Sequence, residues 1–563
     1  MENTFTYTTK GKIVSSVEKV LLHKEPKTEE RFSYMMKNER LNFQIALFSD
    51  SPARRNNRLT VSGTLAPYVS FRSVENVPVT YTAPEADDYY VGKEPGVYPD
   101  LLKPFGAMGL VLPCRQWKSI WVSIENKADL PVGKHTLTFE LHYESGEKAL
   151  ALSYTVEVLD AVAEGNGLKL TNWVHYDCIC AWHKVKPFTD KFYDVLKKYL
   201  QVYVDCGYNM LLTPLFTPPL DTAVGGERPT VQLVDVDVID GKYYFEFSKL
   251  RKFVSFAQEN GIKYFEFSHL FTQWGGKFCP KIVAKKRGRL QKIFGWHVAA
   301  NSTSYQEFLA AFLPLLYREI VGLGLQDVSY MHLTDEPNAQ SVEMYANCCA
   351  LIKKYMPAIP TIDALSNPIY CERNIVDIPV PITTHYADFT RFPLKEKFVY
   401  YCCFPNNEYY SNRFINMPGV RTRILGMQLY QTGVNGFLHW GFNFYNSLLA
   451  IERINPYAET NACGFYPGGD GFIVYPGDHQ IYYSIRSELM KEAVQDYNAL
   501  KTLASLQGKE FVMNILAKAG INGYNEYPRQ TKSFLKLRKE IYQQIKNVFN
   551  NGPKAFKARR QKR

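Results

Sequence analysis

Hydrophobic and polar residues alternate along the first part of the chain, which is the pattern of strands that bury one face. The segment HTLTFELHYESGEKALALSYTVEV (135–158) shows this pattern on both sides of the polar turn ESGE, so two paired strands are predicted. WKSIWVSIEN (117–126) predicts another strand. Together these segments favour a β-sandwich as the architecture of residues 1–165.

From about residue 168 the pattern changes to short apolar strands that alternate with amphipathic helices. The strands are predicted at residues 172–177, 209–216, 264–271, 327–337, 361–366, 382–387, 398–404 and 434–442. Eight strands in βα alternation indicate a (β/α)8 TIM barrel over residues 166–500. An open doubly wound sheet is the alternative, but its usual Gly-rich phosphate turn is missing after the first strand.

Helix signals complete the predicted multidomain organisation. Thr189 is suited to cap a helix that ends at Gly207, whereas the helices expected after the fifth and sixth strands are weakly marked. A helix is predicted over residues 484–506. The remainder, residues 501–563, is predicted to be a helical extension that ends in a basic tail.

Charge is concentrated in two segments of the 563-residue chain, whose formal net charge is +11. The last ten residues, KAFKARRQKR (554–563), carry six basic side chains, and KIVAKKRGRLQK (281–292) carries six more and no acid. Either segment could attract anionic glycans or nucleic acid. A solvated tail and a solvated loop are the simpler interpretations, so no nucleic-acid partner is expected.

Eleven cysteines are scattered through the chain without a CxxC pair, which argues against a zinc ribbon or a redox motif. No grouping of His, Cys and Asp has convincing metal-ligand spacing, so neither a metal nor another cofactor is predicted. The first sixteen residues lack the hydrophobic core of a secretory signal, and no apolar run reaches membrane-spanning length. A cytoplasmic location without membrane contact is expected, and the oligomeric state is left open.

The segment MHLTDEP (331–337) ends a predicted strand with two neighbouring acids, Asp335 and Glu336, followed by Pro337. Neighbouring residues of a regular strand point to opposite faces, so both acids face one cavity only where the strand stops. Pro337 favours that stop, because it lacks a backbone donor and biases the preceding residue to extended geometry. Reactive groups of barrels lie at this end of the strands. Acids that merely stabilise the start of the next helix are the alternative.

Two close carboxyl groups tend to differ in pKa, because ionising one makes ionising the other more costly. One group can stay charged while the other keeps a proton, a division that suits glycoside hydrolysis. Adjacent residues do not easily face each other across a sugar, as the common retaining scheme requires. Substrate assistance fits better: the acetamido oxygen of a 2-acetamido sugar attacks C1, one acid orients the acetamide, and the other protonates the leaving oxygen.

A family resemblance extends from the β-rich region to about residue 500. The order of HLTDEP on the fourth strand, GFLHWGFNFYN (436–446), GDGFIVYPG (469–477) and SIRSELMKEAVQDY (484–497) resembles glycoside hydrolase family 123, whose barrel is also described as a domain of unknown function. The resemblance implies a bacterial, retaining β-N-acetylgalactosaminidase that uses substrate assistance on a carbohydrate substrate. It also implies that Asp335 positions the acetamido group, while Glu336 acts as general acid and then general base.

Side chains at other predicted strand ends are candidate sugar contacts. His175 and Asp177 share one face at the end of the first strand and could bind hydroxyl groups, or brace the barrel mouth. His269 ends the third strand, and Trp274 follows beside glycines, where its ring suits the apolar face of a sugar or packs under its own loop. Trp296 in IFGWHVAA is a further candidate of this kind.

The sixth and eighth predicted strands add three candidates. Tyr386 could hydrogen-bond the acetamide oxygen and help it attack, or could simply form part of the wall. Trp440 could wall the N-acetyl methyl group, with Asn443 at the same strand end. The family resemblance favours a substrate-binding role for this strand end.

Three other functions stay open on the sequence alone. A two-carboxylate retaining glycosidase would use Glu336 as acid/base and Asp363 or Glu408 as nucleophile. A catalytically inactive carbohydrate-binding protein would not need the intact pair, so Asp335 and Glu336 count against it. A nucleic-acid binder would use the two basic segments and bind weakly, with a steep dependence on salt.

Overall fold

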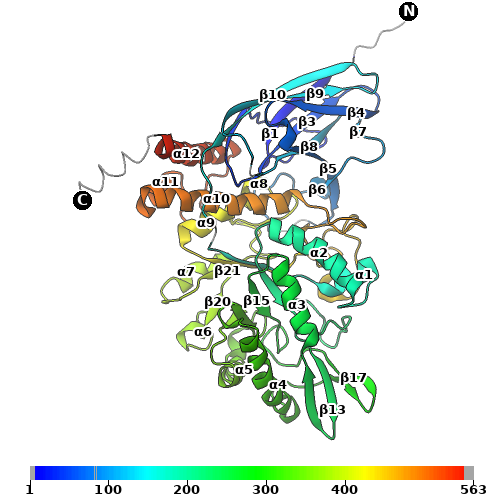
Figure 1. Cartoon of the computed structure of the whole chain (residues 1–563), viewed down its shortest axis with the longest axis vertical. Helices are drawn as coiled ribbons and strands as arrows, with labels where there is room; N and C mark the ends of the chain where they lie inside the picture. The colour runs from blue at the N-terminus through cyan, green and yellow to red at the C-terminus, as the bar shows by residue number, and fades with distance from the viewer. Residues whose placement is uncertain (1–6, 82, 84, 128, 166, 551–563) are drawn as a thin grey trace, which may run out of the picture. The chain divides into compact units, whose positions relative to one another are not determined.

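The computed structural model describes residues 7–81, 83, 85–127, 129–165 and 167–550 (Figure 1). These residues form two compact units that interleave along the chain. Unit 1 contains the described residues of 1–166, 406–432 and 482–563, and unit 2 contains residues 167–405 and 433–481. The domains expected from the sequence, 1–165, 166–500 and 501–563, are continuous segments, and their boundaries stay a prediction.

The N-terminal part of unit 1 is β-rich. Among its described residues, one five-stranded sheet has the order β1 (Thr9–Ser15), β3 (Leu41–Ser49), β8 (Gln116–Ile124), β5 (Val69–Val79), β6 (Gly96–Lys103). The other has the order β2 (Phe32–Met36), β10 (Lys148–Leu159), β9 (Gly133–His142), β4 (Arg54–Ser62), β7 (Leu110–Leu112). Both sheets contribute to one hydrophobic core, in which Phe43 stacks on Tyr154 with ring centroids 4.3 Å apart.

The predicted strand pair of this region is confirmed. β9 and β10 run antiparallel, with Leu141 opposite Leu150. Leu137, Phe139 and Val156 are fully buried, so the alternation in the sequence marks the core face as expected.

The remaining helices of unit 1 come from two separate segments. They are α8 (Gly419–Arg423), α9 (Leu425–Thr432), α10 (Ile485–Gln507), α11 (Lys509–Lys518) and α12 (Thr531–Asn550). The predicted start of α10 is confirmed, because the Ser484 side chain caps the helix by accepting from the Ser487 backbone N–H. Helix α9 packs closely on α10: a Cβ atom at Gly426 would lie 1.8 Å from the carbonyl oxygen of Ala493. Only glycine allows this approach.

Unit 2 contains an eight-stranded parallel sheet within its described residues. In chain order its strands are β11 (Lys169–Asn172), β12 (Met210–Thr213), β15 (Tyr264–Phe267), β18 (Ser329–His332), β19 (Thr361–Ala364), β20 (Ile378–Val380), β21 (Phe398–Tyr400) and β22 (Gly436–His439). Consecutive strands are neighbours, and β22 pairs with β11. The two ends of the sheet, β20 and β21, meet through a bridge between Ile382 and Tyr400. The sheet is therefore a nearly closed barrel.

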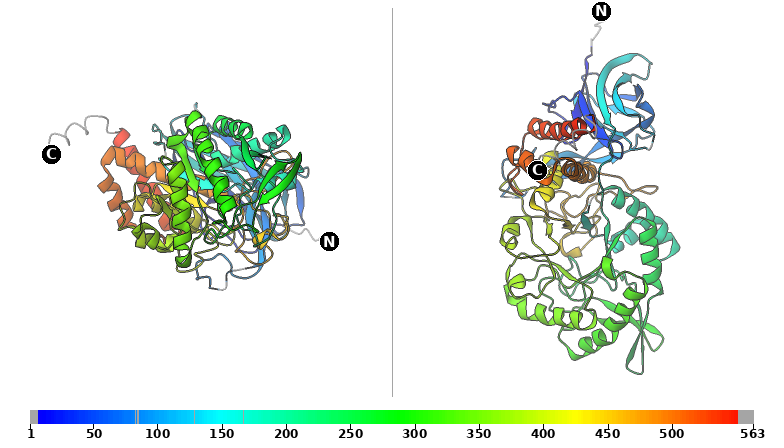
Figure 2. Two further views of the ribbon diagram at one scale, coloured as in Figure 1. Left: turned by 90° about the horizontal axis from the view of Figure 1, so that it is seen from below. Right: turned by 60° about the vertical axis from the view of Figure 1, so that its left-hand side comes forward.

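Helices surround this sheet on its outer side (Figure 2). They are α1 (Tyr176–His183), α2 (Asp190–Asp205), α3 (Ser248–Glu259), α4 (Thr303–Gly322), α5 (Val342–Tyr355), α6 (Ile369–Glu372) and α7 (Tyr386–Phe389). The Thr189 cap of α2 is confirmed, since its side chain accepts from the Phe192 backbone N–H at 3.4 Å. The weak helix signals after the fifth and sixth strands reflect α6 and α7, which have only four residues each.

Two predicted strands are misplaced. The first strand was expected over residues 172–177, but β11 ends at Asn172 and α1 begins at Tyr176. The apolar residues Trp173 and Val174 between them are buried but do not belong to a strand, so their hydrophobic pattern indicated burial and not strand structure. The sixth strand was expected over residues 382–387, but β20 lies earlier, and these residues form a 3-10 turn and the start of α7. β20 was missed because Pro379 and Pro381 are residues that strands usually exclude.

A second, smaller sheet of unit 2 was not predicted. Its described strands have the order β14 (Lys242–Glu246), β13 (Asp235–Ile239), β16 (Ile282–Lys286), β17 (Arg289–Phe294). The basic segment 281–292 is therefore mostly a β-hairpin and not an irregular loop. The basic tail, residues 554–563, lies outside the described residues. Among the described helices, none has the length and apolar character needed to cross a membrane.

The contact between α9 and α10 gives a first testable prediction. Gly426→Ala should lower the free energy of unfolding by about 3 kcal/mol, because the added methyl group forces the two backbones apart. Gly322→Ala at the end of α4 is the matched control, since nothing lies within 4 Å of its added Cβ. That control should be neutral or slightly stabilising. Urea unfolding of both variants measures the difference, and equal stabilities would contradict the close helix contact.

Candidate active site

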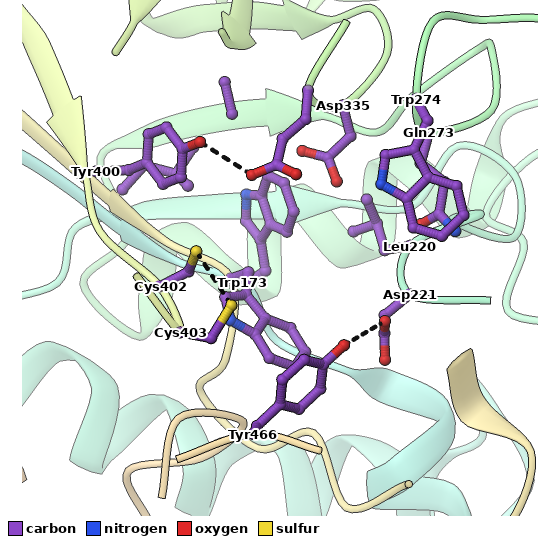
Figure 3. Close-up of a pocket in the computed structure, with 14 residues that line it drawn as sticks. Trp173, Leu220, Asp221, Gln273, Trp274, Asp335, Tyr400, Cys402, Cys403 and Tyr466 are labelled. Carbon is purple, nitrogen blue, oxygen red and sulfur yellow. Dashed lines mark hydrogen bonds between the residues drawn. The ribbon is translucent and has the colours of Figure 1, made fainter. Parts of the chain in front are cut away.

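Unit 2 contains a pocket at the carboxyl ends of its parallel strands (Figure 3). The residues that line it are Trp173, Leu220, Asp221, Gln273, Trp274, Asp335, Glu336, Ala364, Tyr400, Cys402, Cys403, Leu438, Trp440 and Tyr466. Most of them lie at the end of a strand of the parallel sheet or within four residues after it. The two acids singled out in the sequence are among them, together with three tryptophan rings.

The strand that leads to the acids stops before them. β18 ends at His332, and Asp335 and Glu336 lie in a bend. Glu336 has a φ of 46°, in the left-handed region that residues other than glycine rarely adopt. Backbone hydrogen bonds fix the bend: the Trp274 N–H donates to the Asp335 carbonyl at 2.6 Å, and the Glu336 N–H donates to the Ala364 carbonyl at 3.0 Å. This turn of the backbone is how two adjacent carboxyl groups reach one pocket.

Left-handed backbone is shared by three residues of the pocket wall. Asp221 has a φ of 40°, Trp274 a φ of 59° and Glu336 a φ of 46°. Such conformations persist only where the surrounding structure holds them, and they are enriched at functional sites. The presence of all three in one pocket indicates that the surrounding structure holds the backbone of its wall in an uncommon conformation.

The two carboxyl groups have raised pKa values. Burial is the largest cause for each, and the charge of Glu336 raises the pKa of Asp335 further. Glu336 as a whole residue is exposed, whereas burial of its carboxyl group is the main cause of its raised pKa. The pKa of Asp335 is raised well above its usual range, so the pair keeps a proton at a pH where isolated carboxyl groups are ionised.

A buried cation lies behind the pair. His332 Nδ1 lies 2.6 Å from Glu266 Oε1, and its Nε2 lies 3.5 Å from Asp363 Oδ1. Burial alone would lower the pKa of His332, but hydrogen bonds and attraction from Asp363 and Glu266 raise that pKa to about 10. The imidazolium therefore stays charged, and its charge partly offsets the rise in the pKa of Asp335.

Tyr400, at the end of β21, was not predicted as a site residue. Its hydroxyl group donates a hydrogen bond to Glu336 Oε1 at 2.9 Å. Tyr400 lies in the apolar run FVYYCCF, in which nothing distinguishes it from a core tyrosine. Asp221, Gln273, Cys402, Cys403 and Tyr466 were missed as well, because most of them lie in loops whose course the pattern does not determine.

Two of the predicted aromatic residues line the pocket with the acids. Trp274 is 42% exposed, so its ring is available to a ligand. The Trp440 indole N–H donates to Asp470 Oδ2 at 2.9 Å, which holds the ring in place. Trp173 forms the floor, and its indole N–H donates to Glu266 Oε1 at 2.9 Å. An aromatic floor and walls suit the apolar face of a pyranose.

Three other predicted residues form a buried network behind the wall. Asp177 makes a bidentate ion pair with Arg228, at 2.6 Å to Oδ1 and 3.0 Å to Oδ2. Arg228 also donates to His175 Nδ1 at 3.2 Å, and the His175 Nε2–H donates to the Trp440 carbonyl at 2.9 Å. The Asn443 side chain accepts from the His175 backbone N–H and donates to its carbonyl. This arrangement corresponds to the bracing alternative raised from the sequence.

The last three predicted residues do not line the pocket. His269 is buried, with its ring centroid 4.1 Å from that of His332, and burial holds its pKa well below the usual range. Trp296 packs its ring on Phe278, at a centroid distance of 6.0 Å. Tyr386 is half-buried at the start of α7. Their assignment as substrate-binding residues stays a prediction.

One group of side chains has donor atoms close enough to be considered for a metal ion. His269, His332 and Asp335 each offer one atom within 4.8 Å of the others. His332 fits poorly, because it is protonated and directs its nitrogens at Glu266 and Asp363, whereas a metal needs the neutral imidazole. The absence of a metal stays a prediction.

Comparison with known proteins identifies the family. The profile of the glycoside hydrolase 123 catalytic domain matches residues 173–503. The chain therefore belongs to glycoside hydrolase family 123 and is a glycoside hydrolase. No curated protein matches the chain by sequence.

A solved structure of the same family shows the same fold. A family 123 glycoside hydrolase from Clostridium perfringens, described for glycolipid glycan hydrolysis, superposes with a TM-score of 0.73 and 16% identity, covering 98% of this chain and 99% of its own. An endo-β-1,4-mannanase from Thermotoga petrophila gives a TM-score of 0.33 at 14% identity, over 59% of this chain and 77% of its own. A Lactobacillus rhamnosus β-glucuronidase gives 0.32 at 10% identity, over 87% and 67%. Only the first is similar enough to support the fold.

The buried ion pair gives a second prediction. Arg228→Met leaves Asp177 charged and buried without a cation, and should lower the free energy of unfolding by about 3–5 kcal/mol. Adding Asp177→Asn to that variant should recover part of the loss. Arg251→Met, which removes a half-exposed surface pair with Glu319, is the control and should cost less than about 1 kcal/mol.

The ion pair also has a pH signature. Burial raises the pKa of Asp177, but attraction from Arg228 outweighs it, so the pKa is lowered in the folded state. The stabilisation is therefore present above the unfolded pKa, about 4, and is lost as the pH falls through the folded value. Urea unfolding of wild type and Asp177→Asn between neutral and acidic pH measures it. A stability difference that stays constant with pH would contradict the assignment.

Proposed function

We propose that the enzyme is a retaining β-N-acetylgalactosaminidase, or acts on a related 2-acetamido sugar, by substrate-assisted catalysis. The observation that carries the proposal is the pair of adjacent carboxyl groups, Asp335 and Glu336, turned into one aromatic pocket by the left-handed Glu336. The proposal includes the finer architecture expected from the sequence: a (β/α)8 TIM barrel for the parallel sheet, and a β-sandwich for the two N-terminal sheets.

In the proposed first step, the acetamido oxygen attacks C1 of its own sugar while the C1–O bond to the leaving group breaks. Glu336 gives its proton to the leaving oxygen, and Asp335 accepts a hydrogen bond from the acetamide N–H. The products are an oxazolinium ion, whose N–H stays hydrogen-bonded to the ionised Asp335, and the free aglycone. In the second step a water molecule attacks C1 and gives a proton to Glu336, so the ring reopens with the original anomeric configuration.

The mechanism needs an ionised Asp335 and a protonated Glu336. In the free protein the larger rise in pKa is that of Asp335, so the proposal requires the proton to lie on Glu336 once substrate is bound. Two groups favour this arrangement. The His332 cation stabilises negative charge on Asp335, and the acetamide N–H of a bound substrate would do the same from the other side. We therefore assign the proton to Glu336 in the substrate complex. We propose that the Tyr400 hydroxyl group, which has a single proton, turns from Glu336 to the acetamide oxygen when substrate binds, a role expected of Tyr386 from the sequence.

The two-carboxylate alternative has less support from its named nucleophiles. Asp363 is fully buried and accepts hydrogen bonds from the Thr334 backbone N–H and hydroxyl group, both at 2.9 Å. Glu408 is exposed and belongs to unit 1. The glycan of a glycolipid is a substrate class worth testing here, because the similar Clostridium perfringens enzyme is described for it.

The third prediction tests the reaction itself. Wild-type enzyme should release p-nitrophenol from the β-N-acetylgalactosaminide but not from the matching 2-hydroxy galactoside, which lacks the nucleophile. Glu336→Gln should lower kcat by about 10²–10⁴-fold, as expected for loss of a general acid. Asp335→Asn should lower kcat while leaving the protein folded, since the change is isosteric.

The control for these variants is the stable thiazoline analogue of the oxazoline, which should inhibit the wild type strongly. Tight inhibition together with retained configuration, followed by proton NMR, supports substrate assistance. Hydrolysis of the 2-hydroxy galactoside at a comparable rate would instead support a two-carboxylate enzyme. Binding of the glycan without any turnover would support an inactive carbohydrate-binding protein.

The fourth prediction concerns pH. Burial raises the pKa of Glu336, and the hydrogen bond from Tyr400 lowers it. Removing that bond in Tyr400→Phe should raise the pKa of Glu336 further, because the hydrogen bond stabilises the ionised carboxylate. A general acid must be protonated, so the alkaline limb of kcat/KM should move to higher pH.

The pH profile of kcat/KM for both enzymes provides the measurement. Tyr244→Phe, at a half-exposed tyrosine of β14 in the same unit, is the control and should keep the wild-type profile. An unchanged alkaline limb in Tyr400→Phe would rule out Glu336 as the group that titrates there.

A further inference from the structure

A carboxyl group without an assigned role lies in the same pocket as the acid pair. Asp221 lines the pocket from the loop after β12, and the hydroxyl group of Tyr466 donates to its Oδ1 at 2.8 Å. Figure 3 shows Asp221 and Tyr466 on the side of the pocket away from Asp335 and Tyr400, with Trp173 and Leu220 between them. We propose that Asp221 binds the sugar hydroxyl groups remote from the reacting carbon, at C4 and C6, and so determines which sugar is accepted.

The Asp221 carboxylate has acceptor sites that the described protein groups do not occupy. Besides Tyr466, its carboxylate accepts from the Leu449 backbone N–H at 3.2 Å. A carboxylate has about four acceptor sites, so two remain for a ligand. No salt bridge to Asp221 occurs among the residues that the structure describes, and the nearest cation, Arg228, is engaged by Asp177. Burial raises the pKa of Asp221 to about 6, so the group is ionised at neutral pH.

The surroundings of Asp221 hold it in place before any ligand binds. Its backbone is left-handed, with a φ of 40°. Arg228 donates to the carbonyl of the preceding Leu220 at 2.8 Å, and Gln273 donates to the carbonyl of the following Thr222 at 2.9 Å. The carbonyl of Leu449 accepts from the Ala223 N–H at 3.1 Å. Such constraint is what a group needs if it is to discriminate between positions of a hydroxyl group.

The positions of the acid pair and of Asp221 on opposite sides of the pocket determine how the sugar is oriented in this proposal. This step rests on the proposed function, in which C1 and the C2 acetamide lie at Glu336 and Asp335. The ring then extends over the aromatic floor, and its C4 and C6 end points away from the acid pair. Asp221 is the charged group on that side. A hydroxyl group bound there by an ionised carboxylate contributes strongly to selection, because an analogue without it leaves an acceptor site of the half-buried carboxylate unsatisfied.

The test compares two enzymes on three substrates. Wild type and Asp221→Asn are assayed on p-nitrophenyl N-acetyl-β-galactosaminide and on its 4-deoxy and 6-deoxy analogues. In wild type, removing a contacted hydroxyl group should lower kcat/KM by about 10–100-fold. Asp221→Asn should lower kcat/KM on the parent to a similar extent, and removing the hydroxyl group from the substrate should then cost only about 2–3-fold more, because the two changes remove the same interaction.

The control is Asp240→Asn, which makes the same change at an exposed aspartate that is also left-handed, with a φ of 49°. It should keep wild-type kcat/KM on every substrate. Tyr466→Phe removes one of the two hydrogen bonds that hold Asp221 and should weaken discrimination at the same hydroxyl group. Thermal unfolding of each variant separates a folding defect from a binding defect.

Three results would overturn the inference. Effects of Asp221→Asn and of deoxygenation that multiply independently would show that the two groups do not meet. A fall in kcat of about 10⁴-fold with rescue by azide would make Asp221 a nucleophile. Hydrolysis of the parent sugar with normal kinetics in Asp221→Asn would contradict this inference without affecting the proposed function. Absence of turnover by wild type would contradict both.

Discussion

Placing two adjacent carboxyl groups in one pocket is the constraint on which the rest of the site depends. Their mutual repulsion and their loss of water both oppose ionisation, and a regular strand would point them apart. The structure meets these conditions with separate devices. The left-handed Glu336 turns its side chain toward that of Asp335, and the buried His332 cation supports charge on Asp335 from behind. Tyr400 contacts the other acid, so the two carboxyl groups have different environments. Different environments are what allow two like groups to take different roles.

The residues behind the wall explain how those devices are held. Arg228 connects three elements, because it bonds Asp177 on α1, the carbonyl of Leu220 in the loop after β12, and His175, which in turn holds the Trp440 carbonyl. A single buried guanidinium thus fixes the loop that carries Asp221 and the strand end that carries Trp440. His175 and Asp177, which were predicted as substrate contacts, therefore act indirectly in this arrangement, by holding other residues of the pocket in position.

The sequence predicted the β-rich N-terminal region, the alternation of strands and helices that follows it, and the position of the acids at the end of a strand, since all three depend on local patterns. Strand β18 and the acids after it form one contiguous motif, and the hairpin of β9 and β10 shows clean alternation. What failed depended on contacts between distant segments. β20 was not recognised because its sequence contains proline. Tyr400 reaches the pocket through the closure of the sheet, and Asp221 reaches it through the course of a loop. His175 and Asp177 were recognised as polar residues of the site region, but only Arg228, far along the chain, shows that they brace the wall.

The interleaving of the two units limits how this protein could have been assembled. The chain passes between units four times, and the segment that supplies α8 and α9 to unit 1 leaves and re-enters unit 2 between β21 and β22. The strands on either side of that excursion carry Tyr400 and Trp440 into the pocket. A recombination event that exchanged either unit as one continuous stretch of gene would therefore cut through the other. The β-rich unit and the unit that contains the pocket therefore cannot be exchanged separately as single continuous gene segments.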